Sequence, residues 1–185
     1  MKTKRILLVL LAVSIILNIF SFAYARKYKN IVKDDVQTML TYAFADVESM
    51  NIELEKISAD KVVTKDQLTE LEHSFDKFIT NVQNLRFTVE KIDEKYLEKT
   101  GNFQSYYFCT NDFSKFSSRI TEESNATRFT LSQDDLEYIK RLKKNLYAVE
   151  KVKKDNSYTK DDMIYLKMDQ WMKIVKELAA VDMMQ

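Results

Sequence analysis

The chain has 185 residues with one glycine, no proline and one cysteine, and its formal net charge is +1. Glycine and proline serve tight turns and helix stops, so their near absence argues against sheets and hairpins and favours helices joined by short polar links. The same composition excludes glycine-rich phosphate loops and an intramolecular disulfide, and the balanced charge predicts no nucleic-acid binding.

The N-terminus has the features of a membrane-targeting segment. A short basic start, Met1 to Arg5, precedes an apolar run from Ile6 to Phe20, and residues 6–25 together are long enough to span a bilayer. The sequence therefore predicts that residues 1–25 form a signal anchor. This predicts a single-pass protein of the cytoplasmic membrane whose C-terminal domain lies outside the cytoplasm. The alternative is a signal peptide cleaved after Ala25, with a secreted product.

The next segment, Arg26 to about Ser58, repeats apolar residues at spacings of three and four, which predicts a helix of about 33 residues. Nothing between Ala25 and Val32 stops a helix, so this one is free to continue from the leader. The link that follows, Ala59 to Val63, is short. Short links between helices favour antiparallel neighbours.

From Thr64 to Lys99 the apolar residues follow an unbroken heptad pattern, which predicts one long helix with a single apolar seam. Several seam residues are aromatic, and such rings fit a multi-helix core better than a two-stranded coiled coil. The two long helices are therefore expected to form an intrachain hairpin. The seam residues are Leu68, Leu71, Phe75, Phe78, Val82, Leu85, Val89, Ile92 and Tyr96.

Three shorter helices are predicted in the remainder of the chain. The first runs from about Phe103 to Glu122, after Gly101 has ended the long helix, and the polar segment Thr121 to Thr127 is expected to be a mobile loop. The second ends near Lys154, and the third covers Lys160 to Val181. Three helix starts carry a hydroxyl cap with a polar or acidic residue three positions later: Thr64 with Gln67, Ser132 with Asp135, and Thr159 with Asp162.

These elements predict an all-α fold. A membrane-targeting N-terminal helix is followed by a bundle of about five helices, made of the long antiparallel hairpin and the three shorter helices. Residues 26–185 are expected to form a single extracytoplasmic helical bundle domain.

No residue pattern predicts catalysis, a metal site or a cofactor. The sole histidine, His73, falls at the outermost heptad position and lacks a second histidine or a cysteine partner. Asp134-Asp135 and Asp161-Asp162 lie in first helical turns, where negative charge is stabilised by the helix dipole. Cys109 lies on an apolar stripe and is expected to be buried and unreactive. The sequence therefore predicts a protein that is not an enzyme.

The residues that remain as candidates form surfaces for interaction. Phe87 falls at an outward heptad position although it is large and apolar, and it is therefore a candidate contact for a partner. The most basic run after the leader includes Lys140, Lys143, Lys144 and Lys151. This run is either a solvated helix face or a surface that binds anionic headgroups or wall polymers.

The predicted function is that of a membrane-anchored, non-enzymatic interaction or scaffold module of a bacterial cell envelope, with an unknown protein partner. The alternative is a secreted or anchored binding module. In that case a small apolar or amphipathic ligand would lie between aromatic-rich helices, in a pocket lined by side chains from Tyr106 to Phe116.

Overall fold

A computed structural model of the chain describes residues 2–92, 103–122, 126–156 and 168–183. Their chain contacts divide into two units, residues 1–35 and residues 36–185. The chain is mostly helical, which confirms the predicted all-α class. Its elements are α1 (Lys2–Asp60), β1 (Val62–Thr64), α2 (Lys65–Ile92), α4 (Gln104–Glu122), β2 (Arg128–Thr130), α5 (Gln133–Asp155) and α6 (Met168–Ala179).

The first unit consists of the N-terminal part of α1. Its described side chains are largely apolar and solvent-exposed, from 47% for Val13 to 73% for Tyr24. The helix continues without a break through Ala25, which confirms that nothing stops it at the end of the leader. The predicted division into a leader and a mature domain at residue 25 stays a prediction.

The predicted membrane anchor is wrong. Within the described ranges, no helix has a stretch that is both long and apolar enough to cross a bilayer. The apolar run of Ile6 to Phe20, which Ser14 and Asn18 interrupt, is shorter than the roughly 20 residues that a spanning helix needs. This finding contradicts the single-pass localisation in the cytoplasmic membrane, and it gives the alternative of secretion after Ala25 no support.

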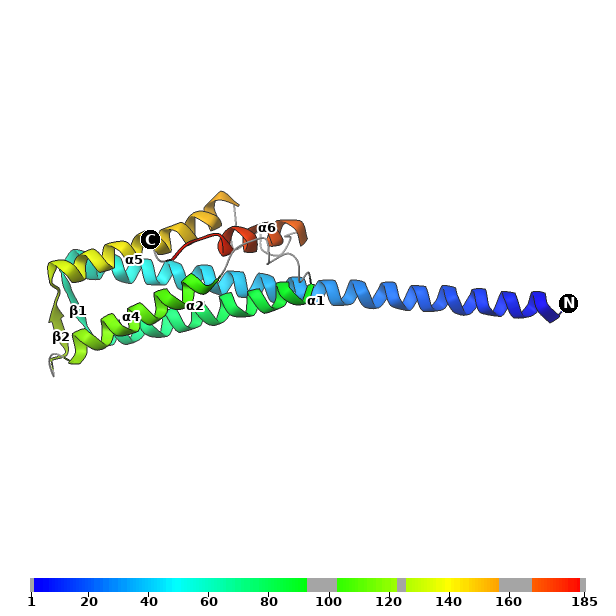
Figure 1. Cartoon of the computed structure of the whole chain (residues 1–185), viewed down its shortest axis with the longest axis horizontal. Coiled ribbons are helices and arrows are strands. Elements are labelled where there is room, and N and C mark those ends of the chain that lie inside the picture. The colour runs from blue at the N-terminus through cyan, green and yellow to red at the C-terminus, as the bar shows by residue number, and fades with distance from the viewer. Residues whose placement is uncertain (1, 93–102, 123–125, 157–167, 184–185) are drawn as a thin grey trace. The chain divides into compact units, whose positions relative to one another are not determined.

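The second unit is a helical bundle in which α1 and α2 run antiparallel (Figure 1). Asn81 Nδ2 of α2 donates to Asp46 Oδ2 of α1 at 3.2 Å, and Gln67 Nε2 near the start of α2 donates to Glu53 Oε1 at 2.7 Å. The residue number rises along α1 as it falls along α2. The predicted long hairpin is therefore present over residues 36–92.

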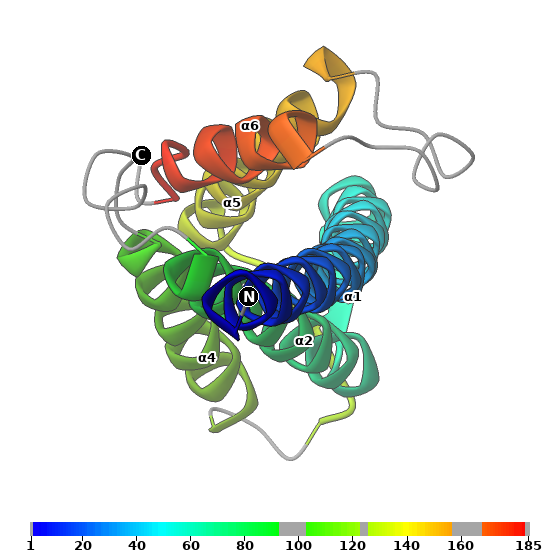
Figure 2. The same ribbon diagram turned by 90° about the vertical axis from the view of Figure 1, so that its right-hand side faces the viewer.

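Helices α4 and α5 complete a ring of four antiparallel neighbours (Figure 2). The rings of Phe75 in α2 and Phe113 in α4 lie 4.8 Å apart between centroids. The rings of Phe116 in α4 and Tyr138 in α5 stack at 4.6 Å. Ion pairs described below join α5 to α1. Up-and-down order of this kind is the simplest way to bury one stripe of each helix.

The heptad seam forms the centre of this bundle. All seven seam residues from Leu68 to Val89 are at most 2% exposed, which confirms that the predicted seam faces inward over this range. Burying a side chain of this size contributes roughly 1.5–3 kcal/mol, so the seam is a main source of stability. The end of the predicted seam, at Tyr96, lies outside the described residues.

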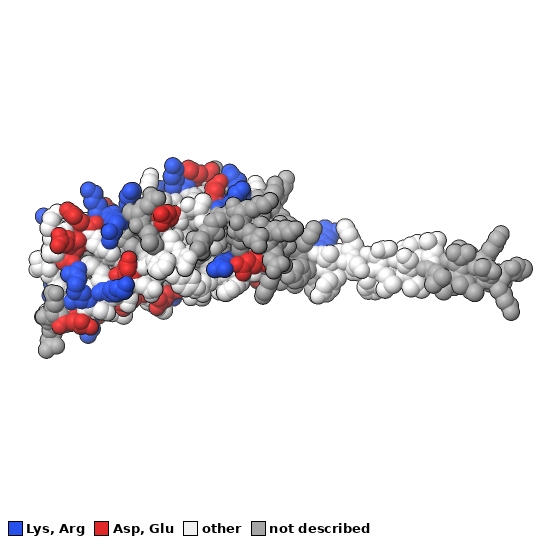
Figure 3. Space-filling view, in the orientation of Figure 1, with Lys and Arg blue, Asp and Glu red and all other residues white. Residues whose placement is uncertain are grey.

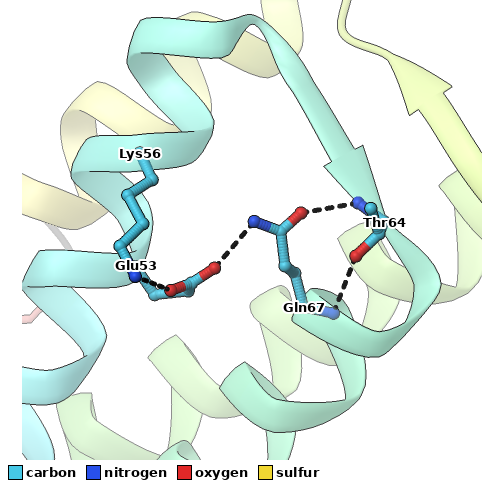
Figure 4. A network of polar contacts seen from close by, with 4 residues as sticks. All are labelled: Glu53, Lys56, Thr64 and Gln67. Atoms are coloured by element: carbon cyan, nitrogen blue, oxygen red, sulfur yellow. Dashed lines mark hydrogen bonds and ion pairs between the residues drawn. The ribbon is translucent and has the colours of Figure 1, made fainter.

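The start of α2 is fixed by the predicted capping box, which Figure 4 shows. Thr64 Oγ1 accepts from the Gln67 amide at 3.1 Å, and Gln67 Oε1 accepts from the Thr64 amide at 2.8 Å. Gln67 also donates to Glu53, which pairs with Lys56 at 3.0 Å. Burial alone would raise the pKa of Glu53, but the Gln67 bond and Lys56 outweigh it and leave that pKa lowered. The network connects the α2 start to α1.

The second predicted capping box, at the start of α5, is also present. Ser132 Oγ accepts from the Asp135 amide at 3.2 Å, and Asp135 Oδ2 accepts from the Ser132 amide at 2.8 Å. The other oxygen of Asp135 pairs with Arg119 of α4. The structure thus confirms the structural role expected for Asp135. The third predicted cap, Thr159 with Asp162, lies outside the described residues.

A small sheet departs from the sequence-based expectation. Strand β1 pairs antiparallel with β2, in the register Val62 with Thr130, Val63 with Phe129 and Thr64 with Arg128. In an up-and-down bundle the α1–α2 and α4–α5 connections lie at the same end, so two extended links can pair across the bundle. Such pairing needs no tight turn and therefore no glycine or proline.

Side chains of α4 and α5 hold helix α6 and the residues that follow it. Tyr106 Oη of α4 donates to the Leu178 carbonyl at 2.7 Å, and Asn145 Nδ2 of α5 donates to the Met183 carbonyl at 2.7 Å. Trp171 is only 1% exposed. The helix predicted over Lys160 to Val181 is therefore present over residues 168–179, while its predicted start near Lys160 lies outside the described part of the chain.

Candidate functional site

The sequence presents the lysines of α5 as one basic run, but the structure separates five of the six into two groups. The first group holds α5 against α1. Lys143 pairs with Glu55, and Lys153 Nζ donates to Glu48 Oε2 at 3.1 Å. These lysines are half-buried, with 26% and 30% of the side chain exposed. They act in the fold and are poorly available to a partner.

Other cations of α5 contact their own helix. Lys154 Nζ lies 3.5 Å from Glu150 Oε2 and 5.2 Å from the centroid of the Tyr147 ring. Glu150 also accepts from Asn51 Nδ2 of α1 at 2.8 Å. Arg141 lies over the ring of Tyr138, 5.5 Å from its centroid. Each such cation–π contact contributes about 0.5–1 kcal/mol at an exposed site.

The second group consists of Lys140, Lys144 and Lys151. All three are exposed, and none has an ion pair with another described residue. Together with Tyr147 they follow spacings of four, three and four, which places them on one stripe of the helix. Tyr147 is 57% exposed. The stripe therefore presents an aromatic ring between unpaired positive charges.

This stripe borders a groove between α5 and α1. The groove has a volume of about 650 Å³ and is open to solvent. Its walls come from both helices: Asn51, Glu55 and Ser58 of α1, and Gln133, Leu136, Glu137, Lys140, Lys143, Lys144, Tyr147 and Glu150 of α5.

The charged side chains that line the groove balance in number but differ in whether they are paired. Three lysines and three glutamates line it, but Glu55 and Glu150 are already paired with Lys143 and Lys154. Lys140 and Lys144 therefore face Glu137 alone. On the face of the bundle that Figure 3 shows, both signs of charge are interspersed. The groove is thus a local feature and does not belong to a large basic surface.

Not every predicted contact residue belongs to this groove. Lys140, Lys143 and Lys144 line it, whereas Lys151 lies two turns beyond Lys144 and is not among the lining residues. Phe87 is 53% exposed on α2, as its heptad position predicts, but it is not among the lining residues. The structure does not bring Phe87 together with the lysines.

Tyr147 and the α1 residues that line the groove were not among the predicted contact residues. Tyr147 could have been found, because it lies three residues after Lys144 on the stripe of the candidate lysines. Asn51 and Glu55 gave no such signal, because only the tertiary fold brings α1 beside α5.

The residues considered for catalysis lie apart. His73 is exposed on α2. Cys109 is buried, and burial raises the pKa of its thiol to about 12, which keeps it protonated and unreactive at neutral pH. Within the described ranges, no group of three or more His, Cys, Asp or Glu side chains could hold a metal ion.

Of the five aromatic residues considered for ligand binding, three are tightly packed, whereas Tyr107 and Phe108 are exposed. Tyr106, Phe113 and Phe116 are at most 6% exposed, and the rings of Phe113 and Phe116 lie 5.9 Å apart. A cavity beside Cys109 has a volume of about 100 Å³. That is smaller than the roughly 300–1,000 Å³ of typical ligand pockets.

Comparison with known proteins adds no assignment: neither a family model, nor a curated protein, nor a solved structure matches this chain.

Proposed function

We propose that this chain is a non-enzymatic protein-interaction module and that the α1–α5 groove is its contact surface. The observation that carries the proposal is the exposed ring of Tyr147, which lies in an open groove of about 650 Å³ between lysines that have no partner in the described part of the chain. Aromatic residues are enriched at the energetically dominant positions of protein interfaces.

The walls of the groove also favour this function. Lys143, Lys153 and Asn51 connect α1 to α5 along the groove, so the surface is held in one shape before a partner arrives. A preformed surface reduces the ordering cost of association. The alternative of a small apolar ligand between aromatic helices stays a prediction, and the packed rings of α4 give it no support.

Site-specific photo-crosslinking tests the proposal in the organism that carries this chain. A photoreactive phenylalanine analogue replaces Tyr147 in the groove, and separately replaces Tyr107, a 40% exposed aromatic residue of α4. We expect a discrete protein adduct, identified by mass spectrometry, at position 147 only. The adduct should disappear when Lys140 and Lys144 are both changed to glutamate.

The same experiment includes a third crosslinking position, Phe87, on the competing surface of α2. An analogue in place of Phe87 reports on the outward face of α2. A discrete adduct at position 87, with none at position 147, would show that the protein binds its partner through α2 and would overturn the assignment of the groove.

A further inference from the structure

The geometry of the groove points to one class of occupant: we infer that it binds an acidic α-helical segment of a partner protein, laid along α5. This inference rests on the proposed function, since it specifies the chemistry of the partner. Four features of the groove support it: the charge of the stripe, the spacing of the lysines, the exposed ring of Tyr147, and the glutamates that line the groove.

The charge of the stripe requires acidic groups on the partner. Lys140, Lys144 and Lys151 are exposed and have no ion pair within the described residues, whereas Lys143 and Lys153 are already used against α1. An acidic segment would therefore pair with charges that have no ion pair among the described residues. Complementary charge of this kind speeds association and fixes the register of the bound segment.

The spacing of the lysines favours a helix over a strand. They are separated by four and then seven residues of α5, about 6 and 10.5 Å at about 1.5 Å per residue. A partner helix has the same rise, so acids at spacings of four and seven would meet all three lysines. A strand covers these distances in about two and three residues, and an odd step would turn the third acid to the opposite face.

Tyr147 supplies the apolar anchor between the charges. Its ring is 57% exposed and lies on the stripe between Lys144 and Lys151, while Leu136 contributes a second apolar surface to the groove. A partner helix with an apolar residue between its acids would cover the Tyr147 ring. The groove follows α5 from Gln133 to Glu150, about 25 Å, which matches a helix of about 17 residues.

The glutamates of the groove argue against a nucleic acid or a lipid surface as occupant. Glu137 and Glu150 lie on either side of the lysines along α5, and Glu55 lies on the α1 wall. A continuous row of phosphates would meet these carboxylates as well as the lysines and would be repelled by them. A protein helix can place acids only opposite the lysines.

Fluorescence anisotropy with the full chain tests this inference. The probe is a labelled peptide of about 17 residues that carries glutamates at spacings of four and seven, with leucines between them. Its controls are a peptide of the same composition in scrambled order and a peptide with a central proline. We expect the patterned peptide to bind, at least about tenfold more tightly than either control, and its affinity to fall as salt is raised.

Two matched variants locate the binding. The double variant Lys140→Glu/Lys144→Glu should weaken peptide binding about tenfold or more. The variant Lys77→Glu/Lys115→Glu, which makes the same change in net charge with exposed lysines of α2 and α4, should leave it within about twofold.

Three outcomes would overturn the inference: equal binding of the patterned and scrambled peptides, equal loss in both double variants, or tighter binding of a single-stranded oligonucleotide or of anionic vesicles that depends on the same two lysines. The proposed function is judged separately. If the adduct at position 147 forms but the patterned peptide does not bind, the interaction module stands and the acidic helix is rejected.

Discussion

Lys61 ends α1 in an unusual backbone conformation. Its φ is +55°, in the left-handed region, and its amide donates to the Ile57 carbonyl at 2.9 Å, as at a typical helix C-terminus. For a residue other than glycine this conformation costs roughly 1–2 kcal/mol. The chain has only one glycine, at position 101, so a lysine occupies a position where glycine is favoured.

Replacing this lysine should therefore stabilise the protein. We expect Lys61→Gly to raise the free energy of unfolding by about 0.5–1 kcal/mol, because relief of the left-handed strain exceeds the entropy that glycine adds to the unfolded chain. The control Ala45→Gly, within α1 at an exposed position, should lower it by about 1 kcal/mol. Urea unfolding measures both, and destabilisation by Lys61→Gly would contradict this account of the α1 terminus.

Asp135 should give the stability a dependence on pH. Burial alone would raise the pKa of this carboxyl, but hydrogen bonds from Ser132 and Arg119 outweigh it, so the pKa lies below its usual value. The ionised form is therefore favoured in the folded state. Its contribution is present above the unfolded pKa of about 3.9 and is lost as pH falls through the lower folded pKa.

The variant Asp135→Asn isolates this contribution. At pH 7 it should lower the free energy of unfolding by about 1–3 kcal/mol, and its difference from the wild type should narrow as pH falls from about 5 to 2. Asp134→Asn, an exposed neighbour in the same helical turn, should cost only about 0.5 kcal/mol. Equal effects of the two substitutions, measured by urea unfolding across this pH range, would mean that the contacts of Asp135 with Ser132 and Arg119 add nothing to stability.

At the scale of elements, the docking of α6 depends on a hydrogen bond from a neighbouring helix. Tyr106 is 1% exposed, and its hydroxyl donates to the Leu178 carbonyl. Tyr106→Phe removes this hydrogen bond and leaves the carbonyl with the Val181 amide as donor, so it should cost about 0.5–1.5 kcal/mol. Amide hydrogen exchange should accelerate most in α6. The neighbouring exposed residue offers the control, because Tyr107→Phe should change stability by less than about 0.5 kcal/mol.

Periodicity predicted the helices well because each buries one stripe. The heptad from Leu68 to Val89 placed α2 and its buried face, and the caps at Thr64 and Ser132 placed two helix starts within a residue. The β1–β2 pairing had no such signal, because its partners lie more than 60 residues apart and each strand has only three residues. Its formation follows from the position of two links at one end of the bundle.

At this scale the main error was the prediction that the N-terminal segment forms a membrane anchor. The apolar run from Ile6 to Phe20 was interpreted together with the weaker residues that follow it, which extended it to the length of a bilayer. Within the described residues no helix meets both the length and the hydropathy that a span requires. The prediction therefore gave more weight to the apolar composition of residues 6–25 than to the length of the apolar run within them.

At the scale of the whole molecule, the groove depends on a fold that the sequence could specify only in part. The α5 half of the groove was visible as a basic run. The α1 half was not, because neighbours in a closed four-helix ring follow from packing and not from chain order. The structure also divided the lysines by role: Lys143 and Lys153 bind α1, while Lys140 and Lys144 remain available.

This division has a direct test in stability. Lys143→Glu should lower the free energy of unfolding by about 1 kcal/mol, because it removes the pair with Glu55 and places two negative charges together. Lys140→Glu, one turn away and unpaired within the described residues, should change it by less than about 0.5 kcal/mol. Thermal unfolding at low salt provides the comparison. If Lys140→Glu lowered the free energy of unfolding more than Lys143→Glu, the assignment of Lys143 to the fold and of Lys140 to the contact surface would be wrong.

Hydroxyl-radical footprinting of side chains tests the groove as contact surface most directly. Tyr147 and Phe87 are both aromatic and are 57% and 53% exposed, so each reports on its own surface in one sample. With the protein identified by crosslinking at position 147 bound, oxidation of Tyr147 should slow at least severalfold while oxidation of Phe87 stays unchanged. Protection of Phe87 with no change at Tyr147 would contradict the account.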